Sequence, residues 1–121
     1  MTIRETMIKA FSIALIWQDG NLDDYDVCDI SHDTNILIIE TIDQFLGKLN
    51  EKEYPDLLSA DNFGHWLCLE LMGHGSGFYD SLNSVVAGIS DKLEGWNIPR
   101  PDHTYADDNK IHCDFFTYGK K

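Results

Sequence analysis

Basic residues are scarce in this sequence of 121 residues. Nine lysines and arginines stand against 21 aspartates and glutamates, so the formal net charge is -12 at pH 7 with histidine neutral. A surface with this excess of carboxylates repels phosphate groups, because each contact would bring like charges together. We therefore expect no direct binding of DNA, RNA or an anionic membrane surface.

Cysteines and long apolar runs are also few. The three cysteines, Cys28, Cys68 and Cys113, show no Cys-x-x-Cys spacing, which suits a reducing cytosol better than a disulfide framework. No apolar run approaches the roughly 20 residues of a membrane-spanning helix. Charged residues also interrupt the apolar N-terminus, so no secretory leader is indicated. These absences predict a soluble protein of the cytoplasm.

Apolar residues are nevertheless sufficient for a core, at 43% of the chain with 12% aromatic. The length predicts a single domain over residues 1–121. Thr2 and Glu5 have capping-box spacing, and apolar residues recur every four positions up to a turn signal at 18–21, which predicts a first helix. Ser31 is a suitable N-cap for a second helix running to about Glu53.

The second half of the sequence predicts strands and a third helix. Residues 65–72 (HWLCLELM) are typical of a strand, and the glycines that follow predict antiparallel pairing with 77–80. An apolar stripe over 82–93 predicts a helix, capped by Asp80 or Ser81 and ended by Gly95. Residues 103–105 and 110–116 then predict a closing hairpin. The resulting fold class is α+β, with three helices packed on a small antiparallel sheet in the order ααββαββ.

The segment 73–77 (GHGSG) places three glycines around His74 and Ser76. A phosphate-binding loop would need a strand before the glycines, a helix after them and, in the Walker form, a following lysine. No lysine lies between Lys52 and Lys92. We interpret the segment as a turn whose glycines permit positive φ and close approach of neighbouring chain.

A ligand site around this turn is the alternative. A metal site would draw on His65, Cys68 and His74, with Asp80 as a further candidate ligand, but His65 and Cys68 would face opposite sides of a strand. A nucleophile would be Cys68 or Ser76 beside His74. However, a buried thiol is inert, and Ser76 lacks the strand–turn–helix context of a nucleophile elbow. We expect no metal or cofactor. The alternative small-molecule, metal or enzymatic site would comprise His65, His74, Ser76, Tyr79 and Asp80.

Acidic residues gather in the segment 22–33, with a second patch at Asp102, Asp107 and Asp108. An EF-hand is excluded, because counting from Asp19 puts no glycine at the sixth position and no glutamate at the twelfth. Two interpretations remain: a solvated surface, or a row of carboxylates that imitates a nucleic-acid backbone. The candidate partner-binding residues are Asp23, Asp24, Asp26, Asp29 and Asp33.

Two segments carry a family resemblance. The stretch LDDYDVCDIS at 22–31 and the stretch GHWLCLELMGHGSGFYD at 64–80 resemble small phage and prophage proteins that share a Gly-His-Gly-small-Gly-Phe-aromatic-Asp turn. This chain departs from their pattern at 70–72, where a polar step is usual, and at Tyr79, where tryptophan is common. The resemblance implies a phage-encoded accessory protein of the host cytoplasm and transfers no catalytic residue.

Together these observations predict a binding protein rather than a named enzyme. The expected partner is a host protein, with a nucleic-acid-handling enzyme favoured by the acidic charge. The expected effect is inhibition or modulation of that partner. Homodimerisation through an exposed sheet edge is left open by the sequence.

Overall fold

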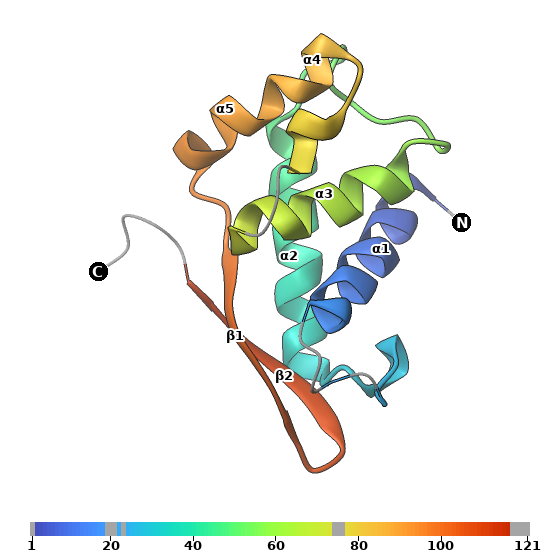
Figure 1. Cartoon of the computed structure of the whole chain (residues 1–121), viewed down its shortest axis with the longest axis vertical. Helices are drawn as coiled ribbons and strands as arrows, with labels where there is room; N and C mark the ends of the chain where they lie inside the picture. Colours follow the sequence, from blue (N-terminus) through green and yellow to red (C-terminus); the bar gives the residue numbers. More distant parts are fainter. Residues whose placement is uncertain (1, 19–21, 23, 74–76, 117–121) are drawn as a thin grey trace.

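The computed structural model describes residues 2–18, 22, 24–73 and 77–116, without the side chains of Tyr79, Asp80 and Glu94. Helices form most of this part of the chain, and one two-stranded antiparallel sheet projects from them (Figure 1). The elements, with η for 3-10 helices, are in chain order α1 (Ile3–Trp17), η2 (Val27–Asp29), α2 (His32–Lys48), α3 (Ala60–Met72), η3 (Gly77–Asp80), α4 (Ser84–Ala87), α5 (Ile89–Leu93), η4 (Glu94–Trp96), β1 (Arg100–Asp107) and β2 (Lys110–Phe116).

The first two helices begin where the sequence predicts. Thr2 Oγ1 accepts a hydrogen bond from Glu5 N at 3.1 Å, and Glu5 Oε1 accepts one from Thr2 N at 3.0 Å, which completes the capping box. Ser31 Oγ accepts from Thr34 N at 3.2 Å and caps α2. However, α2 ends at Lys48 and does not reach Glu53. Asn50 Oδ1 accepts hydrogen bonds from the backbone N–H groups of Lys52 and Glu53. Such local side-chain bonds compete with the backbone bonds that would continue the helix.

The predicted strand at 65–72 is wrong, because these residues belong to the helix α3. Burial along α3 recurs at three- and four-residue intervals, which is the period of a helix with one face in the core. The buried residues of α3 are Ala60, Phe63, Gly64, Leu67, Cys68 and Leu71. This helical pattern begins at Ala60, five residues before the strand-like stretch 65–72, so the helical period cannot be recognised from 65–72 alone.

The predicted antiparallel pairing across the glycine turn is therefore also wrong. Gly73 ends α3 as a left-handed C-cap with φ 73°, and residues 77–80 form the short helix η3. Gly77 has φ 54°, so positive φ is confirmed at both glycines. Gly73 is therefore a helix terminus, because a left-handed glycine satisfies the last free carbonyls of a helix. Residues 74–76 of the predicted turn lie outside the described residues.

The predicted third helix is divided. Asn83 caps it, with Oδ1 accepting from Val85 N at 2.9 Å, in place of Asp80 or Ser81. Gly88 then separates α4 from α5. Gly95 lies within η4, and the left-handed residue that ends this region is Asn97 with φ 52°. The order ααββαββ is corrected accordingly: the described residues up to Trp96 contain helices and no strand, and one hairpin follows them.

The closing hairpin is confirmed. β1 and β2 pair antiparallel, with Tyr105 opposite His112 and Asp107 opposite Lys110. Asp108 and Asn109 form its two-residue turn with φ 52° and 61°, the backbone that matches the twist of a hairpin. The pairing is irregular between Pro101 and His103.

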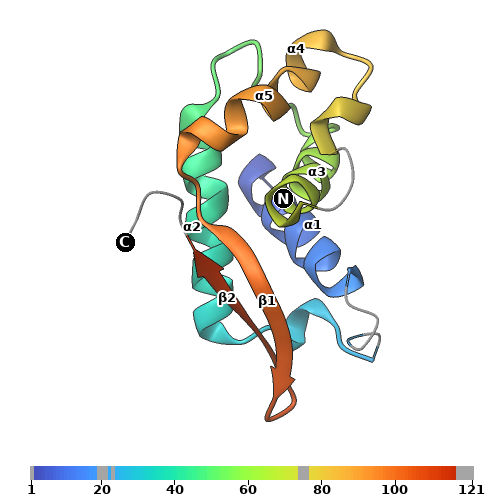
Figure 2. The ribbon, with the colours of Figure 1, turned by 60° about the vertical axis from the view of Figure 1, so that its left-hand side comes forward.

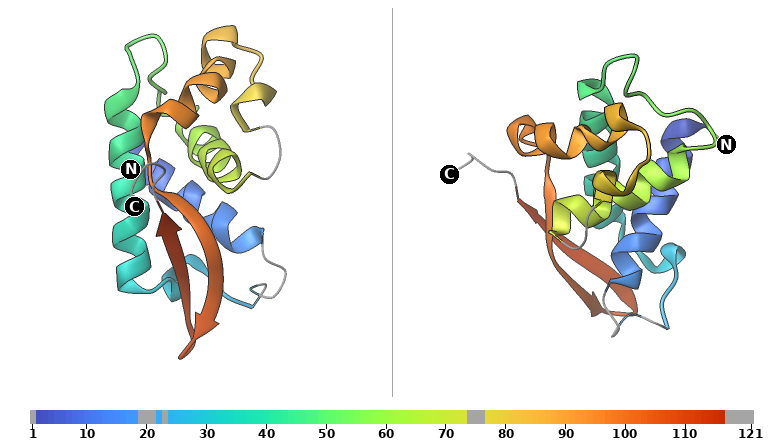
Figure 3. Two further views of the ribbon diagram at one scale, coloured as in Figure 1. Left: turned by 90° about the vertical axis from the view of Figure 1, so that its left-hand side faces the viewer. Right: turned by 45° about the horizontal axis from the view of Figure 1, so that its top comes forward.

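The core joins α1, α2 and α3, and the most extensive helix–helix contact is that of α1 with α3. Phe78 of η3 is fully buried against the rings of Phe45, Phe63 and Trp66. α2 stands on one side of the hairpin and α1 with α3 on the other (Figures 2 and 3). In the described part of the chain, no helix combines the length and apolar character needed to cross a membrane.

Candidate partner-binding surface

The acidic segment 22–33 is held in place by apolar contacts at the C-terminal end of α1. Leu22 is 2% exposed and packs with Ile16 and Ile111 in a small second core. Ile30 forms an isolated parallel bridge with Ile111, and Ser31 N donates to Ile111 O at 2.8 Å. The segment is therefore fixed between α1 and β2, although its composition is that of a loop.

Two of the candidate carboxylates organise this segment. Asp26 Oδ1 accepts from Val27 N at 2.7 Å, and Asp29 Oδ2 accepts from Asp26 N at 2.9 Å. These bonds form a capping box at η2, in which carboxylates satisfy free backbone donors. Asp26 and Asp29 consequently have a structural role that was not predicted from the sequence.

The remaining candidate aspartates differ in position. Asp24 is exposed and lies before η2, and Asp33 is exposed in the first turn of α2. Asp26 is also exposed, whereas Asp29 is half-buried. Asp23 lies outside the described residues. The structure thus places several carboxylates on one fixed segment, with Asp24, Asp26 and Asp33 facing solvent.

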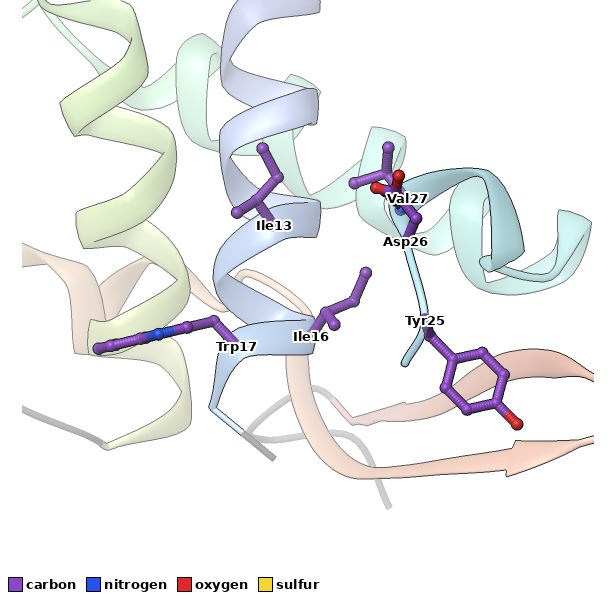
Figure 4. Close-up of a pocket in the computed structure, with 6 residues that line it drawn as sticks. All are labelled: Ile13, Ile16, Trp17, Tyr25, Asp26 and Val27. Atoms are coloured by element: carbon purple, nitrogen blue, oxygen red, sulfur yellow. Dashed lines mark hydrogen bonds between the residues drawn. The ribbon is translucent and has the colours of Figure 1, made fainter. Parts of the chain in front are cut away.

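An apolar hollow adjoins this acidic segment, and we call it the α1 groove. Its volume is about 200 Å³, and it is lined by Ile13, Ile16, Trp17, Tyr25, Asp26 and Val27. Figure 4 shows three of these side chains along α1 and three on the segment that faces it. Trp17 is 70% exposed and Ile13 47%. Large apolar side chains gathered in a hollow and left in water are typical of interaction surfaces.

A second hollow continues past Val27 towards the N-terminus of α1. It has a volume of about 390 Å³ and includes Lys9, Ser12, Cys28 and Asn35 in its lining. Val27 lines both hollows. A ligand in the α1 groove therefore has an adjoining, more polar surface along the same helix.

The alternative ligand site is only partly described. His65 projects from α3 towards Trp17, with ring centroids 6.2 Å apart, so it borders the α1 groove. His74 and Ser76 lie outside the described residues, as do the side chains of Tyr79 and Asp80. In the described ranges no group of three or more His, Cys, Asp or Glu side chains could hold a metal ion.

Cys68 lies in the core between α1 and α3. Its side chain is fully buried, and Gln18 Nε2 donates to Cys68 Sγ at 3.4 Å. Burial raises the pKa of the Cys68 thiol well above its usual range. Because the thiolate is the nucleophile, this arrangement fits the prediction that Cys68 is inert.

The apolar half of this surface was not predicted from the sequence. Ile13 and Trp17 are four residues apart, and so they share one face of α1. That face is distinct from the buried stripe through Met7, Phe11 and Ala14. A second apolar face on the same helix was the signal that could have identified the groove.

Comparison of the chain with protein families, curated proteins and solved structures found no match.

Proposed function

We propose that this chain binds a host protein through the α1 groove and the acidic segment, and thereby inhibits or modulates it. The observation that carries the proposal is an exposed tryptophan and isoleucine beside a hollow that carries Asp26 in its lining. Aromatic anchors surrounded by polar residues provide most of the binding energy at protein interfaces. The expected partner surface combines an apolar side chain with lysine or arginine.

The charge of the chain supports this kind of partner. Asp24, Asp26 and Asp33 are exposed on a segment whose backbone is fixed. Carboxylates held in this way attract a basic surface and increase the rate of encounter. These carboxylates could occupy a basic surface that normally binds the phosphates of a nucleic acid, and would thus mimic that nucleic acid. The partner that we propose is therefore a nucleic-acid-handling enzyme. The resemblance to phage proteins favours a host protein as the target.

The experiment is capture from host lysate with tagged variants, at low and at high salt. Trp17→Ser removes the apolar anchor, and Asp24→Asn/Asp26→Asn/Asp33→Asn removes three charges while an asparagine can still cap η2. Leu82→Ser is the matched control, because Leu82 is fully exposed and lies outside the groove. Each captured protein is then purified, and its dissociation constant is measured against the same variants.

The proposal expects one partner to be retained by the unaltered chain and by Leu82→Ser. Trp17→Ser should weaken that complex by about 2 kcal/mol, or roughly thirty-fold. The triple variant should lose it at physiological salt, with a melting temperature close to that of the unaltered chain. A partner that binds all variants alike, or that is indifferent to salt, would exclude this surface as the site.

A further inference from the structure

In the described part of the chain, one edge of the hairpin is closed by hydrogen bonds, and the other edge has no backbone hydrogen bonds at Thr104 and Ala106. On β2, Cys113 N donates to Thr34 Oγ1 at 3.0 Å, and Ile111 O accepts from Ser31 N at 2.8 Å. Both backbone groups therefore point away from β1, towards the start of α2. The outer edge of β2 is closed by these bonds and by the bridge between Ile30 and Ile111.

The register of the hairpin then determines the direction in which the backbone N–H and C=O groups of β1 point. Cys113 is opposite Thr104, and Ile111 is opposite Ala106. In an antiparallel ladder, the backbone N–H and C=O groups of two paired residues either point towards each other or both point away from the partner strand. The N–H and C=O groups of Thr104 and Ala106 must therefore point outwards from β1. Within the described ranges neither residue has a backbone hydrogen bond outside the hairpin.

This open edge is accessible and carries an aromatic row on the solvent face. Ala106 is exposed, Thr104 is half-buried, and Tyr105 is 39% exposed. The ring of Tyr105 stacks on His103, with centroids 5.6 Å apart, and on His112, with centroids 5.3 Å apart. Flat rings in water are favourable surfaces for a guanidinium group.

The charges around the edge favour a basic partner. The hairpin contains four aspartates, Asp102, Asp107, Asp108 and Asp114, against the cations Arg100 and Lys110, and all four aspartates are exposed. A second copy of the chain would bring another formal charge of -12 to the same place. Charge complementarity therefore selects a basic segment over self-association.

We propose that β1 accepts an extended, arginine-bearing segment of a partner protein as an added strand. Its backbone pairs with Thr104 and Ala106, and every second side chain reaches the row of His103, Tyr105 and His112. Exposed strand edges bind extended peptides in this manner: main-chain bonds provide affinity, and alternate side chains provide specificity. This surface is separate from the α1 groove, so the inference does not depend on the function proposed above.

The test uses a synthetic peptide of alternating arginine and valine, with 8 residues to match β1. The readout is hydrogen exchange at single amides of the intact chain. The control peptide has the same arginines, but proline replaces two valines, so it keeps the charge and cannot pair as a strand. The expected result is slower exchange at Thr104 and Ala106 with the first peptide and unchanged exchange with the second.

A pair of variants makes the test specific to the edge. Ala106→Pro removes an outward N–H and leaves the ladder to β2 intact, and Ala106→Val keeps that N–H. The peptide should bind Ala106→Pro about ten-fold more weakly, as expected for a lost main-chain bond, and should bind Ala106→Val like the unaltered chain.

Three outcomes would overturn the inference. One is unchanged exchange at Thr104 and Ala106 in the unaltered chain, a measurement that does not depend on any variant folding. Another is equal protection by the proline-containing peptide, which would show attraction by charge alone. The third is a concentration-dependent dimer that already protects Thr104 and Ala106 without peptide, which would make a second copy the occupant.

Discussion

The carboxylate of Glu70 holds the backbone that follows Gly77. Glu70 Oε1 accepts from Phe78 N at 3.2 Å and also from Ser90 Oγ. A Cβ added at Gly77 would overlap the Cγ of Glu70, and Gly77 has φ 54°. The glutamate on α3 thereby fixes the position at which Phe78 enters the core.

Gly77→Ala should therefore destabilise the chain through both strain and overlap. We expect a loss of about 2–4 kcal/mol in the free energy of unfolding, measured by urea denaturation. Gly73→Ala is the control, because Gly73 has φ 73° but nothing within 4 Å of its added Cβ. It should lose only about 1–2 kcal/mol for the left-handed backbone. Equal losses for the two variants would contradict the close approach of Glu70.

α1 and α3 approach each other closely at Gly64. A Cβ at Gly64 would lie 2.5 Å from Met7 O and 2.9 Å from the Cβ of Ala10. Gly64→Ala should force the two helices apart and reduce the free energy of unfolding by about 1–3 kcal/mol. Gly47→Ala in α2, where the added Cβ meets nothing within 4 Å, should instead stabilise the chain by about 0.5–1 kcal/mol. Thermal denaturation of the two variants side by side distinguishes these opposite signs.

Glu53 is a buried carboxylate paired with a lysine. Its side chain is 2% exposed, and it accepts hydrogen bonds from Lys92 Nζ and from Asn50 N. Burial opposes its ionisation, but the bonds from Lys92 and Asn50 and the charge of Lys92 hold the pKa of Glu53 below its usual value. A lowered folded-state pKa gives stability that is present above the unfolded pKa and is lost as pH falls through the folded value.

The unaltered chain should therefore lose stability below about pH 4.5 more steeply than Glu53→Gln, which cannot titrate at this position. The measurement is the melting temperature against pH for both proteins. Lys92→Met is the informative third variant, because it leaves the carboxylate buried without its cation. Burial then raises the pKa of Glu53, so the acid-induced loss should weaken or reverse in Lys92→Met. Identical pH profiles for all three would exclude a contribution from this pair.

The three cysteines should react differently with a thiol reagent. Cys28 is exposed, whereas Cys68 and Cys113 are buried, and burial raises the pKa of both buried thiols. We expect one rapidly modified thiol in the native chain and three in denaturant, followed by absorbance and mass spectrometry. Cys28→Ser should abolish the rapid phase. Rapid native labelling of Cys68 would show that the contact between α1 and α3 opens readily.

The sequence by itself determined those elements whose signals are local. Thr2 with Glu5, and Ser31 before α2, specify helix starts because a capping side chain bonds backbone within the next turn. The closing hairpin follows equally from short-range pairing around Asp108 and Asn109. The acidic segment was identified from composition, although the capping roles of Asp26 and Asp29 were not.

Tertiary structure decided what depends on residues far apart in the chain. The apolar pattern of residues 65–72 is compatible with a strand or with a helix. Packing against α1 favours the helix, because a helix places Gly64 and Leu67 on the one face that is buried in the core. The α1 groove exists only because Leu22 and Ile111 hold the acidic segment against α1. The open edge of β1 likewise depends on α2 closing the other edge of the hairpin. No local pattern contains these contacts, because each joins segments that meet only when the chain folds.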